Sequence, residues 1–385
     1  IPLAAGLPPL AACADVEALR AELPPPEDPA LATAVEAARR ELARAEALGD
    51  VGKHAEALAI VDAIPEPPRV HEPLRAELEL RRGLLLLDLK RYDQAQTTLE
   101  DAAHRALRVD HRRVAIQALS ALGFTVGVRR LQREQGLALE AIALAMAEAL
   151  GEPGLEALVL ADMGSVLESH ALYDPAVERF EQALAILREL YGDEHPAVSA
   201  TLTNLAIARE GRGELEAAFE LGTRALALER RIFGEEHPRV ARLLGSTGID
   251  LHQQGKYEAS ALRLEQALAM QQRLLGPSHP ELAHTLSSLG LALSSLGRHA
   301  EAESRLRAAL ALLERELEPE SIEVIDTIDN LAIAVDAQGR HEEALALHRR
   351  VLAAIEASLG PEHPRTAIAL NNVSSVLLML RRPAE

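Results

Sequence analysis

Four loops of this 385-residue chain carry a histidine in the pattern Gly-x-x-His-Pro, and histidine is a common zinc ligand. The four are His195, His237, His279 and His363. They follow one another at intervals of 42, 42 and 84 residues. If each interval is a pair of helices, successive histidines lie two helix layers apart, at about 8–10 Å per layer. Two nitrogens on one zinc lie within about 4 Å of each other, so the sequence predicts no metal site and no cofactor.

The letters of this loop have a backbone explanation instead. Gly234 can adopt the left-handed conformation that closes a helix, and Pro238 suits the first turn of the next helix, where no N–H is needed. A residue before proline is restricted to extended dihedrals, which is the backbone shape of a helix N-cap. We therefore expect each loop to join two helices and each histidine to be structural.

A second candidate for chemistry is a serine cluster that shares one predicted helix with His284. It comprises Ser287, Ser288, Ser294 and Ser295. A serine hydrolase would also need an orienting carboxylate and an oxyanion hole, and the motif pattern contains neither. We expect these serines to coat a polar surface and the chain not to be an enzyme within these residues.

Composition favours packed helices and excludes several classes of partner. The chain is 48% hydrophobic but only 2% aromatic, with no Trp, so its core must be built from Leu and Ala. A net charge of −19 argues against nucleic acid and anionic membranes. Cys13 is the single cysteine, and no apolar run approaches the roughly 20 residues of a membrane helix. We expect a protein that is cytoplasmic or tethered to a membrane through an upstream segment, on a side that the sequence leaves open.

Small residues recur at the centre of the first helix of each predicted helix pair and mark an internal repeat. They are Ala45, Gly83, Gly123, Gly164, Ala206, Gly248, Gly290, Ala332 and Ser374. The later intervals are 42 residues, while the earlier ones are shorter and irregular. We therefore divide the chain into a proline-rich leader (1–29), irregular repeats (30–150) and regular repeats (151–385), with the first helix at about 30–48.

Apolar residues follow steps of three and four, which places them on one helix face. Leu202, Leu205 and Ala206 illustrate the pattern in one predicted first helix. A single helix pair cannot bury such a face alone, so stability must come from stacking neighbouring pairs.

The run Asn330-Leu331-Ala332, Gly339-Arg340, Ala344, Gly360 and His363-Pro364 resembles the tetratricopeptide repeat, in the 42-residue variant of kinesin light chains. The resemblance implies an all-α fold, a right-handed superhelical solenoid of about eight helical hairpins plus one unpaired helix. It also implies non-catalytic binding of a protein or extended peptide segment in a concave groove. The alternative is a structural spacer or self-association module.

In that family, an Asn two positions before the small residue resembles the one that holds the main chain of a bound peptide, since an amide both donates and accepts. Asn204, Asn330 and Asn372 match, while Asp162, Ser246 and Ser288 depart. An alternative role for this Asn is a hydrogen bond to the neighbouring repeat. If the Asn residues bind peptide, replacing Asn330 and Asn372 by Ala should weaken binding without lowering the melting temperature.

Charged residues beside the Asn positions predict a groove with an acidic end and a mildly basic centre, suited to a peptide of mixed charge. The acidic residues are Asp326, Asp329 and Asp336, and the basic ones are Arg242, His252 and His284.

The leader offers a second resemblance. Leu7-Pro8-Pro9-Leu10, Pro24-Pro25-Pro26 and Asp28-Pro29 resemble the segment that precedes the repeats of certain bacterial serine/threonine protein kinases. That resemblance implies a kinase domain upstream of Ile1 and a regulatory role for the repeats. At the other end we expect the last helix to lack its partner, leaving Leu377, Leu378 and Leu380 poorly covered.

Overall fold

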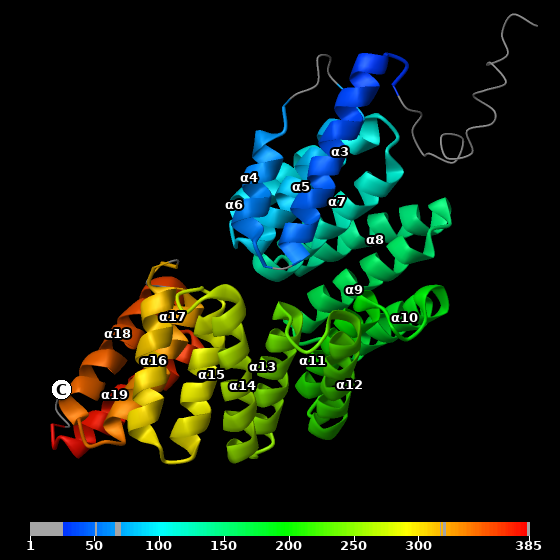
Figure 1. Cartoon of the computed structure of the whole chain (residues 1–385). Coiled ribbons are helices and arrows are strands. Elements are labelled where there is room, and N and C mark those ends of the chain that lie inside the picture. The colour runs from blue at the N-terminus through cyan, green and yellow to red at the C-terminus, as the bar shows by residue number, and fades with distance from the viewer. Residues whose placement is uncertain (1–25, 51, 66–70, 316, 319–320, 383–385) are drawn as a thin grey trace, which may run out of the picture. The chain divides into compact units, whose positions relative to one another are not determined.

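A computed structural model of the chain describes residues 26–50, 52–65, 71–315, 317–318 and 321–382, and all regular secondary structure in these ranges is helical (Figure 1). The helices fall into two compact units that meet between Gly213 and Glu214. The leader motifs up to residue 25 lie outside the described residues. The division of the repeats into irregular ones (30–150) and regular ones (151–385) rests on the spacing of the sequence repeat and stays a prediction.

Unit 1 contains the following helices: α3 (Pro29–Asp50), α4 (His54–Ala63), α5 (Glu72–Asp88), α6 (Tyr92–Arg108), α7 (Arg112–Phe124), the π-helix η1 (Thr125–Arg129), α8 (Arg133–Leu150), α9 (Pro153–Ser169), α10 (Tyr173–Tyr191) and α11 (Pro196–Gly211). Unit 2 contains α12 (Leu215–Phe233), α13 (Pro238–Gln253), α14 (Tyr257–Leu275), α15 (Leu282–Ser295), α16 (His299–Leu313), α17 (Ile322–Asp336), α18 (His341–Leu359) and α19 (Pro364–Met379).

In order along the described chain, α3 to α10 form four consecutive helix pairs in unit 1 and α13 to α18 form three in unit 2, as the repeat predicted. We call the two members of a pair the first and the second helix. In the order of the repeat α11 is a first helix and α12 a second helix, on either side of the division between the units, and α19 comes last. The fold is an all-α repeat solenoid, and α3 starts and ends within two residues of the helix expected from sequence. No helix of the described residues is both long enough and apolar enough to cross a bilayer.

Where the small residue of the first helix is glycine, it allows the second helix to approach closely. A Cβ added to Gly83 or Gly164 in unit 1 would lie 2.6 or 2.7 Å from Leu99 or Phe180, which is inside van der Waals contact. Gly248 and Gly290 in unit 2 meet Leu264 and Leu306 in the same way. Each partner follows its glycine by 16 residues and is buried, so we call this place in the repeat the core position.

The π-helix η1 is the feature of unit 1 that the sequence did not predict. Its widened turn includes a hydrogen bond from the Arg130 N–H to the Thr125 carbonyl, at 3.2 Å. One additional residue enters the repeat there, so the residue that packs on Gly123 follows it by 17 positions and is Glu140. A carboxylate therefore takes the place that Leu or Phe holds at the core positions described above.

Helices in unit 2 are linked differently on the two sides of the array. Short side chains connect successive first helices: Ser287 bonds Thr327 at 2.9 Å, and His252 bonds Ser295 at 3.0 Å. Successive second helices are joined by long side chains, such as Arg307 with Glu343. First helices also make direct backbone-level contacts with one another, so unit 2 is narrower on its first-helix side, which we call the inner side.

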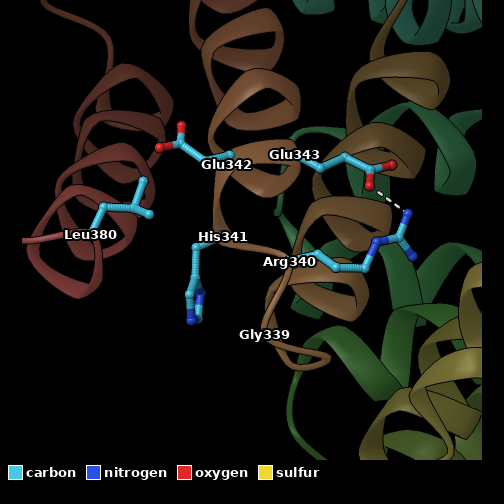
Figure 2. A pocket seen from close by; sticks show the side chains of 6 residues that line it. All are labelled: Gly339, Arg340, His341, Glu342, Glu343 and Leu380. Carbon is cyan, nitrogen blue, oxygen red and sulfur yellow. Dashed lines mark hydrogen bonds and ion pairs between the residues drawn. The ribbon is translucent and has the colours of Figure 1, made fainter.

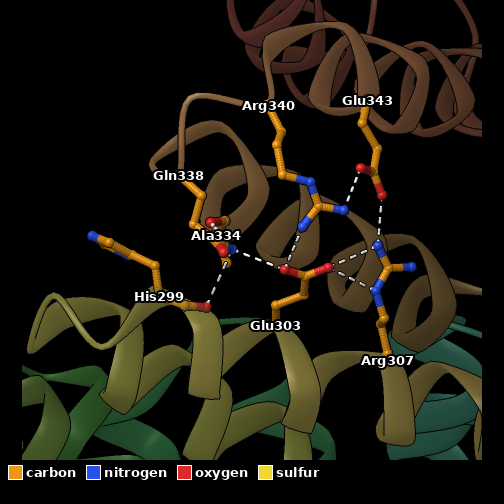
Figure 3. Close-up of polar contacts among 7 residues, drawn as sticks. All are labelled: His299, Glu303, Arg307, Ala334, Gln338, Arg340 and Glu343. Atoms are coloured by element: carbon orange, nitrogen blue, oxygen red, sulfur yellow. Dashed lines mark hydrogen bonds and ion pairs between the residues drawn. The ribbon is translucent and has the colours of Figure 1, made fainter.

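Glu303 is the centre of a network of polar contacts on the outer side of unit 2 (Figure 3). It accepts hydrogen bonds from Gln338, Arg340 and Arg307, and Arg340 and Arg307 both reach Glu343. Burial by itself would raise the pKa of Glu303, but the three donors more than offset it and lower the pKa to about 2. This network ties α16 to α18 at neutral pH.

The Gly-x-x-His-Pro loops confirm the capping role predicted for histidine. The ring Nδ1 of His195, His237 and His363 accepts the N–H two residues later, at 3.2–3.3 Å, and each is the N-cap of its helix. His279 makes the same bond to the Glu281 N–H, although α15 begins only at Leu282.

The glycine of the loop differs from expectation in one dihedral angle. Gly234 has a positive φ of 84°, as predicted, but its ψ is 177° rather than the value near +45° of a left-handed residue. This combination is nearly exclusive to glycine, and open space surrounds the site, so conformation and not crowding requires the residue.

The end of α19 partly contradicts the prediction of poor coverage. Leu378 is 64% exposed, but Leu377 is buried at 6% and Leu380 is half-buried against the same small cluster. Leu377 points toward the preceding pair, whose packing the prediction ignored.

A shallow hollow lies between Leu380 and the start of α18, lined by Gly339, Arg340, His341, Glu342 and Glu343 (Figure 2). In two earlier turns the residue corresponding to Leu380 is Gln254 or Gln338, whose amide donates to the carbonyl of the preceding turn. Leucine cannot make that bond. The hollow therefore lies where this hydrogen bond between neighbouring turns is missing. None of the described residues that line it offers a buried polar group for a ligand.

Candidate functional site

The candidate site is the solvent-facing inner side of α13, α15 and α17 in unit 2, which we call the inner face. Steps of four and three residues place its members on one side of each helix. They are Arg242, Ser246 and Ile249 from α13, His284, Ser288 and Leu291 from α15, and Asp326, Asn330 and Ile333 from α17. Six of these nine residues were predicted from the sequence, and the three aliphatic ones were not.

The aliphatic residues form a row with one member on each first helix, every 42 residues. Leu291 is 37% exposed and Ile333 is 47% exposed, while Ile249 is half-buried against the core of unit 2. Large apolar side chains are normally buried. Apolar side chains that stay exposed at the same position of successive repeats therefore indicate a surface that binds a partner. The signal was available in the sequence, because each of these residues follows its small anchor by one position.

Polar groups line one edge of this row. Ser288 and Asn330 are partly exposed, and their side chains make no hydrogen bond within the described residues. The side chain of Asn204 in unit 1 is likewise partly exposed and makes no hydrogen bond within the described residues. Ser246 differs, since its hydroxyl donates to the Arg242 carbonyl at 3.4 Å. The Asn330 amide is therefore available to both an N–H and a C=O of a bound chain.

Asn372 on α19 follows the alternative predicted for this position, a bond to the neighbouring repeat. Its amide nitrogen lies 3.1 and 3.4 Å from the two carboxylate oxygens of Asp329 on α17. Asp329 also contacts the buried ring of His348 at 3.0 Å. Asn372 thus joins two repeats, whereas Asn330 does not.

Because of this difference, the two substitutions of the predicted pair should have different effects on stability. Asn372→Ala should lower the free energy of unfolding by about 1 kcal/mol, because it removes a partly exposed hydrogen bond to a charged group. Asn330→Ala should change it by less than about 0.5 kcal/mol. Urea unfolding of the single variants checks the difference, and equal losses would contradict it.

The acidic residues make contacts within the chain that the sequence did not predict. Asp326 pairs with the cation of Arg365, and Asp336 bonds the His341 ring at 2.7 Å. Asp329 is engaged as described above. Among the three, only Asp326 has an arginine partner, and the mixed-charge ligand stays a prediction.

In the predicted basic centre, the guanidinium of Arg242 is exposed. Burial lowers the pKa of His252, which favours its neutral form. Its ring bonds Ser295, one of the serines of the predicted cluster. No carboxylate in the described structure orients that ring, so the pair lacks the third member of a hydrolase triad. The described residues also contain no group of three His, Cys, Asp or Glu arranged to hold a metal ion.

Comparison with known proteins identifies the repeat. The tetratricopeptide repeat family model matches residues 155–228, 208–273, 263–315 and 322–385, which together exceed half of the chain. The chain belongs to the tetratricopeptide repeat family. Tetratricopeptide repeats are in general non-catalytic modules that bind protein or peptide partners.

Individual relatives share the repeat over limited stretches. RxLR effector protein SFI4 of Phytophthora infestans is 35% identical over 69 residues, covering 18% of this chain and 20% of that protein. Secreted RxLR effector protein RXLR-C07 of Plasmopara halstedii is 40% identical over 57 residues, covering 15% and 18%. The chain thus matches about a fifth of the length of these relatives.

Two solved structures share the fold. A Rap protein complexed with Competence and Sporulation Factor has a TM-score of 0.56 at 12% identity, covering 90% of this chain and 99% of that one. BtubC (BKLC) from P. vanneervenii has a TM-score of 0.51 at 21% identity, covering 60% and 94%. At these identities the likeness shows an all-α tetratricopeptide solenoid and no more.

Proposed function

We propose that this tetratricopeptide chain is a non-catalytic scaffold that binds an extended protein segment on the inner face of unit 2. The observation that carries the proposal is the aliphatic row of half-buried Ile249 and exposed Leu291 and Ile333, bordered by the available side chains of Ser288 and Asn330. An extended chain needs both apolar contacts and partners for its backbone N–H and C=O groups, and this face supplies both.

The spacing of the row suggests the form of the ligand. The first helices α13, α15 and α17 contact one another directly, without an intervening helix layer, and packed helices lie about 8–10 Å apart. A polyproline II segment rises about 3.1 Å per residue with three residues per turn, so every third side chain repeats at about 9 Å on one side. A ligand with an aliphatic side chain at every third residue therefore matches one contact per first helix. A β-strand repeats its side chains at about 7 Å and would drift out of register.

Charge suggests an orientation. Arg242 on α13 is the exposed cation at one end of the row, while Asp326 at the corresponding place on α17 is already paired with Arg365. A carboxylate at the end of the ligand that reaches α13 would pair with Arg242, which favours one chain direction.

A peptide series tests the spacing. We would label nine-residue peptides that hold three leucines in a serine background, at intervals of two, three or four residues. Fluorescence anisotropy with the full chain should give the highest affinity at an interval of three. Equal affinity at all three intervals would refute the register argument.

The inner face itself is tested by Leu291→Ser combined with Ile333→Ser. Loss of two apolar contacts should weaken binding of the interval-three peptide by at least tenfold, since each buried side chain contributes about 1.5–3 kcal/mol. Leu262→Ser is the matched control, because Leu262 is 59% exposed on the second helix α14. If the control variant weakened binding as much as the double variant, the site would lie elsewhere.

The wider context that we propose is a regulatory or scaffold region of a bacterial serine/threonine protein kinase, held in the cytoplasm or tethered to a membrane through another segment. Support for it is the leader resemblance alone, carried by residues 7–10 and 24–29. Kinase motifs upstream of Ile1 in the coding sequence would support it, and more repeats there would oppose it. A spacer or self-association module is the competing proposal, and a mass that rises with concentration would favour it.

A further inference from the structure

Three polar side chains meet in unit 1 where α7, α8 and α9 pack together. The Ser120 hydroxyl on α7 lies 2.8 Å from Glu140 Oε2 on α8 and 2.7 Å from Asp162 Oδ2 on α9. Glu140 is completely buried, and its other oxygen, Oε1, has no hydrogen-bond partner. These three residues form what we call the Glu140 cluster.

The number of hydrogens in this cluster is decisive. A serine hydroxyl carries one hydrogen, so it can donate to one of the two carboxyl groups but not to both. If both were ionised, one of the two short contacts would join oxygen lone pairs without a hydrogen between them. One of the two carboxyl groups must therefore carry a second hydrogen. Glu140 is completely buried and Asp162 is partly exposed, so we assign this proton to Glu140, which donates to Ser120 while Ser120 donates to Asp162.

Among the described residues, no ion pair or hydrogen bond joins Glu140 to a cation, and its helix α8 contacts α7, η1 and α9. On α7 the charged residues Arg112 and Arg113 lie at the far end, paired with Asp110 and Glu152. The cation of η1, Arg129, lies over the rings of Tyr92 and Phe124, and the next residue, Arg130, pairs with Asp93. His170 at the end of α9 bonds the Gly127 carbonyl of η1 at 3.0 Å.

On α9, Glu156 and Glu168 are six residues from Asp162 on either side, and the charge that acts on Glu140 is that of Asp162. Burial and this neighbouring charge raise the pKa of Glu140 well above its usual value. Burial also raises the pKa of Asp162, to about 6.

We propose that the Glu140 cluster is a proton-dependent latch, in which one proton held between Glu140 and Ser120 keeps α7, α8 and α9 closed, and its loss opens them. Asp162 occupies the same repeat position as Asn330, two residues before the small anchor Gly164, and is partly exposed. The latch therefore also governs the surface of unit 1 that corresponds to the inner face of unit 2. This inference does not depend on the proposed peptide ligand.

The sign of the pH effect follows from linkage. Both carboxyls have folded pKa values above the unfolded ones, so the folded state binds more protons and is favoured at low pH. The contribution of Asp162 is lost between about pH 4 and about pH 6. The pKa of Glu140 is raised well above its usual value, so its contribution is lost on the alkaline side, and one proton changes the opening constant by up to tenfold per pH unit. Burial and Glu210 also raise the pKa of Glu168 on α9, so a variant at Glu140 is needed to isolate its contribution.

Glu140→Gln isolates the latch. The amide has nearly the shape of the acid, and its N–H donates to Ser120 at every pH. We would measure amide hydrogen exchange by mass spectrometry on the full chain at pH 6.5, 7.5 and 8.5, corrected for intrinsic exchange rates. Peptides from α13 to α17 in the same samples serve as the internal reference.

In the unsubstituted chain, the opening constant of α7 to α9 should rise by up to tenfold per pH unit until Glu140 ionises, while the reference peptides should not follow. In Glu140→Gln the opening constant of α7 to α9 should not change over this pH range. The matched control Glu134→Gln, an exposed position on the same helix, should behave like the unsubstituted chain.

Two results would overturn the latch: no pH dependence in the unsubstituted chain, or an unchanged slope in Glu140→Gln. Asp162→Asn gives an independent reading if the Gln variant packs poorly. Removing the charge that opposes ionisation of Glu140 should reduce the slope without abolishing it, and an unaltered slope would again exclude the mechanism.

Discussion

Replacing Gly136 by alanine is expected to destabilise unit 1 by about 3 kcal/mol, at the upper end for one added methyl group in a packed interior. The new Cβ would lie 2.6 Å from the Gly127 Cα and 2.8 Å from the Gly123 carbonyl oxygen. Both are backbone atoms, so no side-chain rotation relieves the clash, and α8 must move away from η1. The gain in helix propensity, up to about 1 kcal/mol, is already subtracted.

Thermal unfolding followed by circular dichroism, together with hydrogen exchange in α7 to α9, would measure this loss. Gly49→Ala is the matched control, because Gly49 is also helical and its added Cβ would meet Leu85 at an ordinary 3.6 Å. That variant should be neutral or slightly more stable. If both variants melted together, α8 and η1 could not be in backbone contact.

The second large effect is expected for Arg239→Ala in unit 2, again a loss of about 3 kcal/mol. Arg239 makes two hydrogen bonds, at 2.7 and 2.9 Å, to Glu229, which is almost completely buried. Its guanidinium also lies over the ring of Phe233, which stacks on His237 of the helix-joining loop. Removing the arginine leaves a buried carboxylate without its cation.

A double-mutant cycle separates charge burial from lost packing. Glu229→Gln in the Arg239→Ala background removes the uncompensated charge, so the double variant should be more stable than Arg239→Ala alone. Arg242→Ala, an exposed arginine on the same helix, should leave the urea midpoint unchanged. Equal losses for Arg239→Ala and Arg242→Ala would show that the ion pair contributes nothing.

Most of the fold followed from the sequence because it depends on local, repeated chemistry. The proline after each loop histidine fixes the dihedrals of an N-cap, and the structure confirms this at His195, His237 and His363. The small anchors likewise marked the repeat, and Gly83, Gly164, Gly248 and Gly290 lie where the second helix approaches closely. These rules act within a few residues and do not depend on distant packing.

The features that could not be predicted from the sequence depend on differences between repeats. The π-helix shifts Glu140 into a core position through one additional residue, and only a count from Gly123 to its packing partner exposes the shift. Asn330 and Asn372 look identical in sequence, yet only Asn372 has an aspartate on the adjacent first helix within reach among the described residues. A periodic pattern predicts the shared backbone, whereas the contacts of one copy depend on its neighbours.

The unequal linkage of unit 2 has a mechanical consequence. Short hydroxyl and amide bonds between first helices act as fixed pivots, whereas exposed arginine–glutamate pairs between second helices are soft and are screened by salt. Bending of the array is therefore concentrated along its outer edge. A segment bound across several first helices would change the spacing between those helices little. Binding would instead change the spacing between the second helices on the opposite surface, where a further protein could detect it.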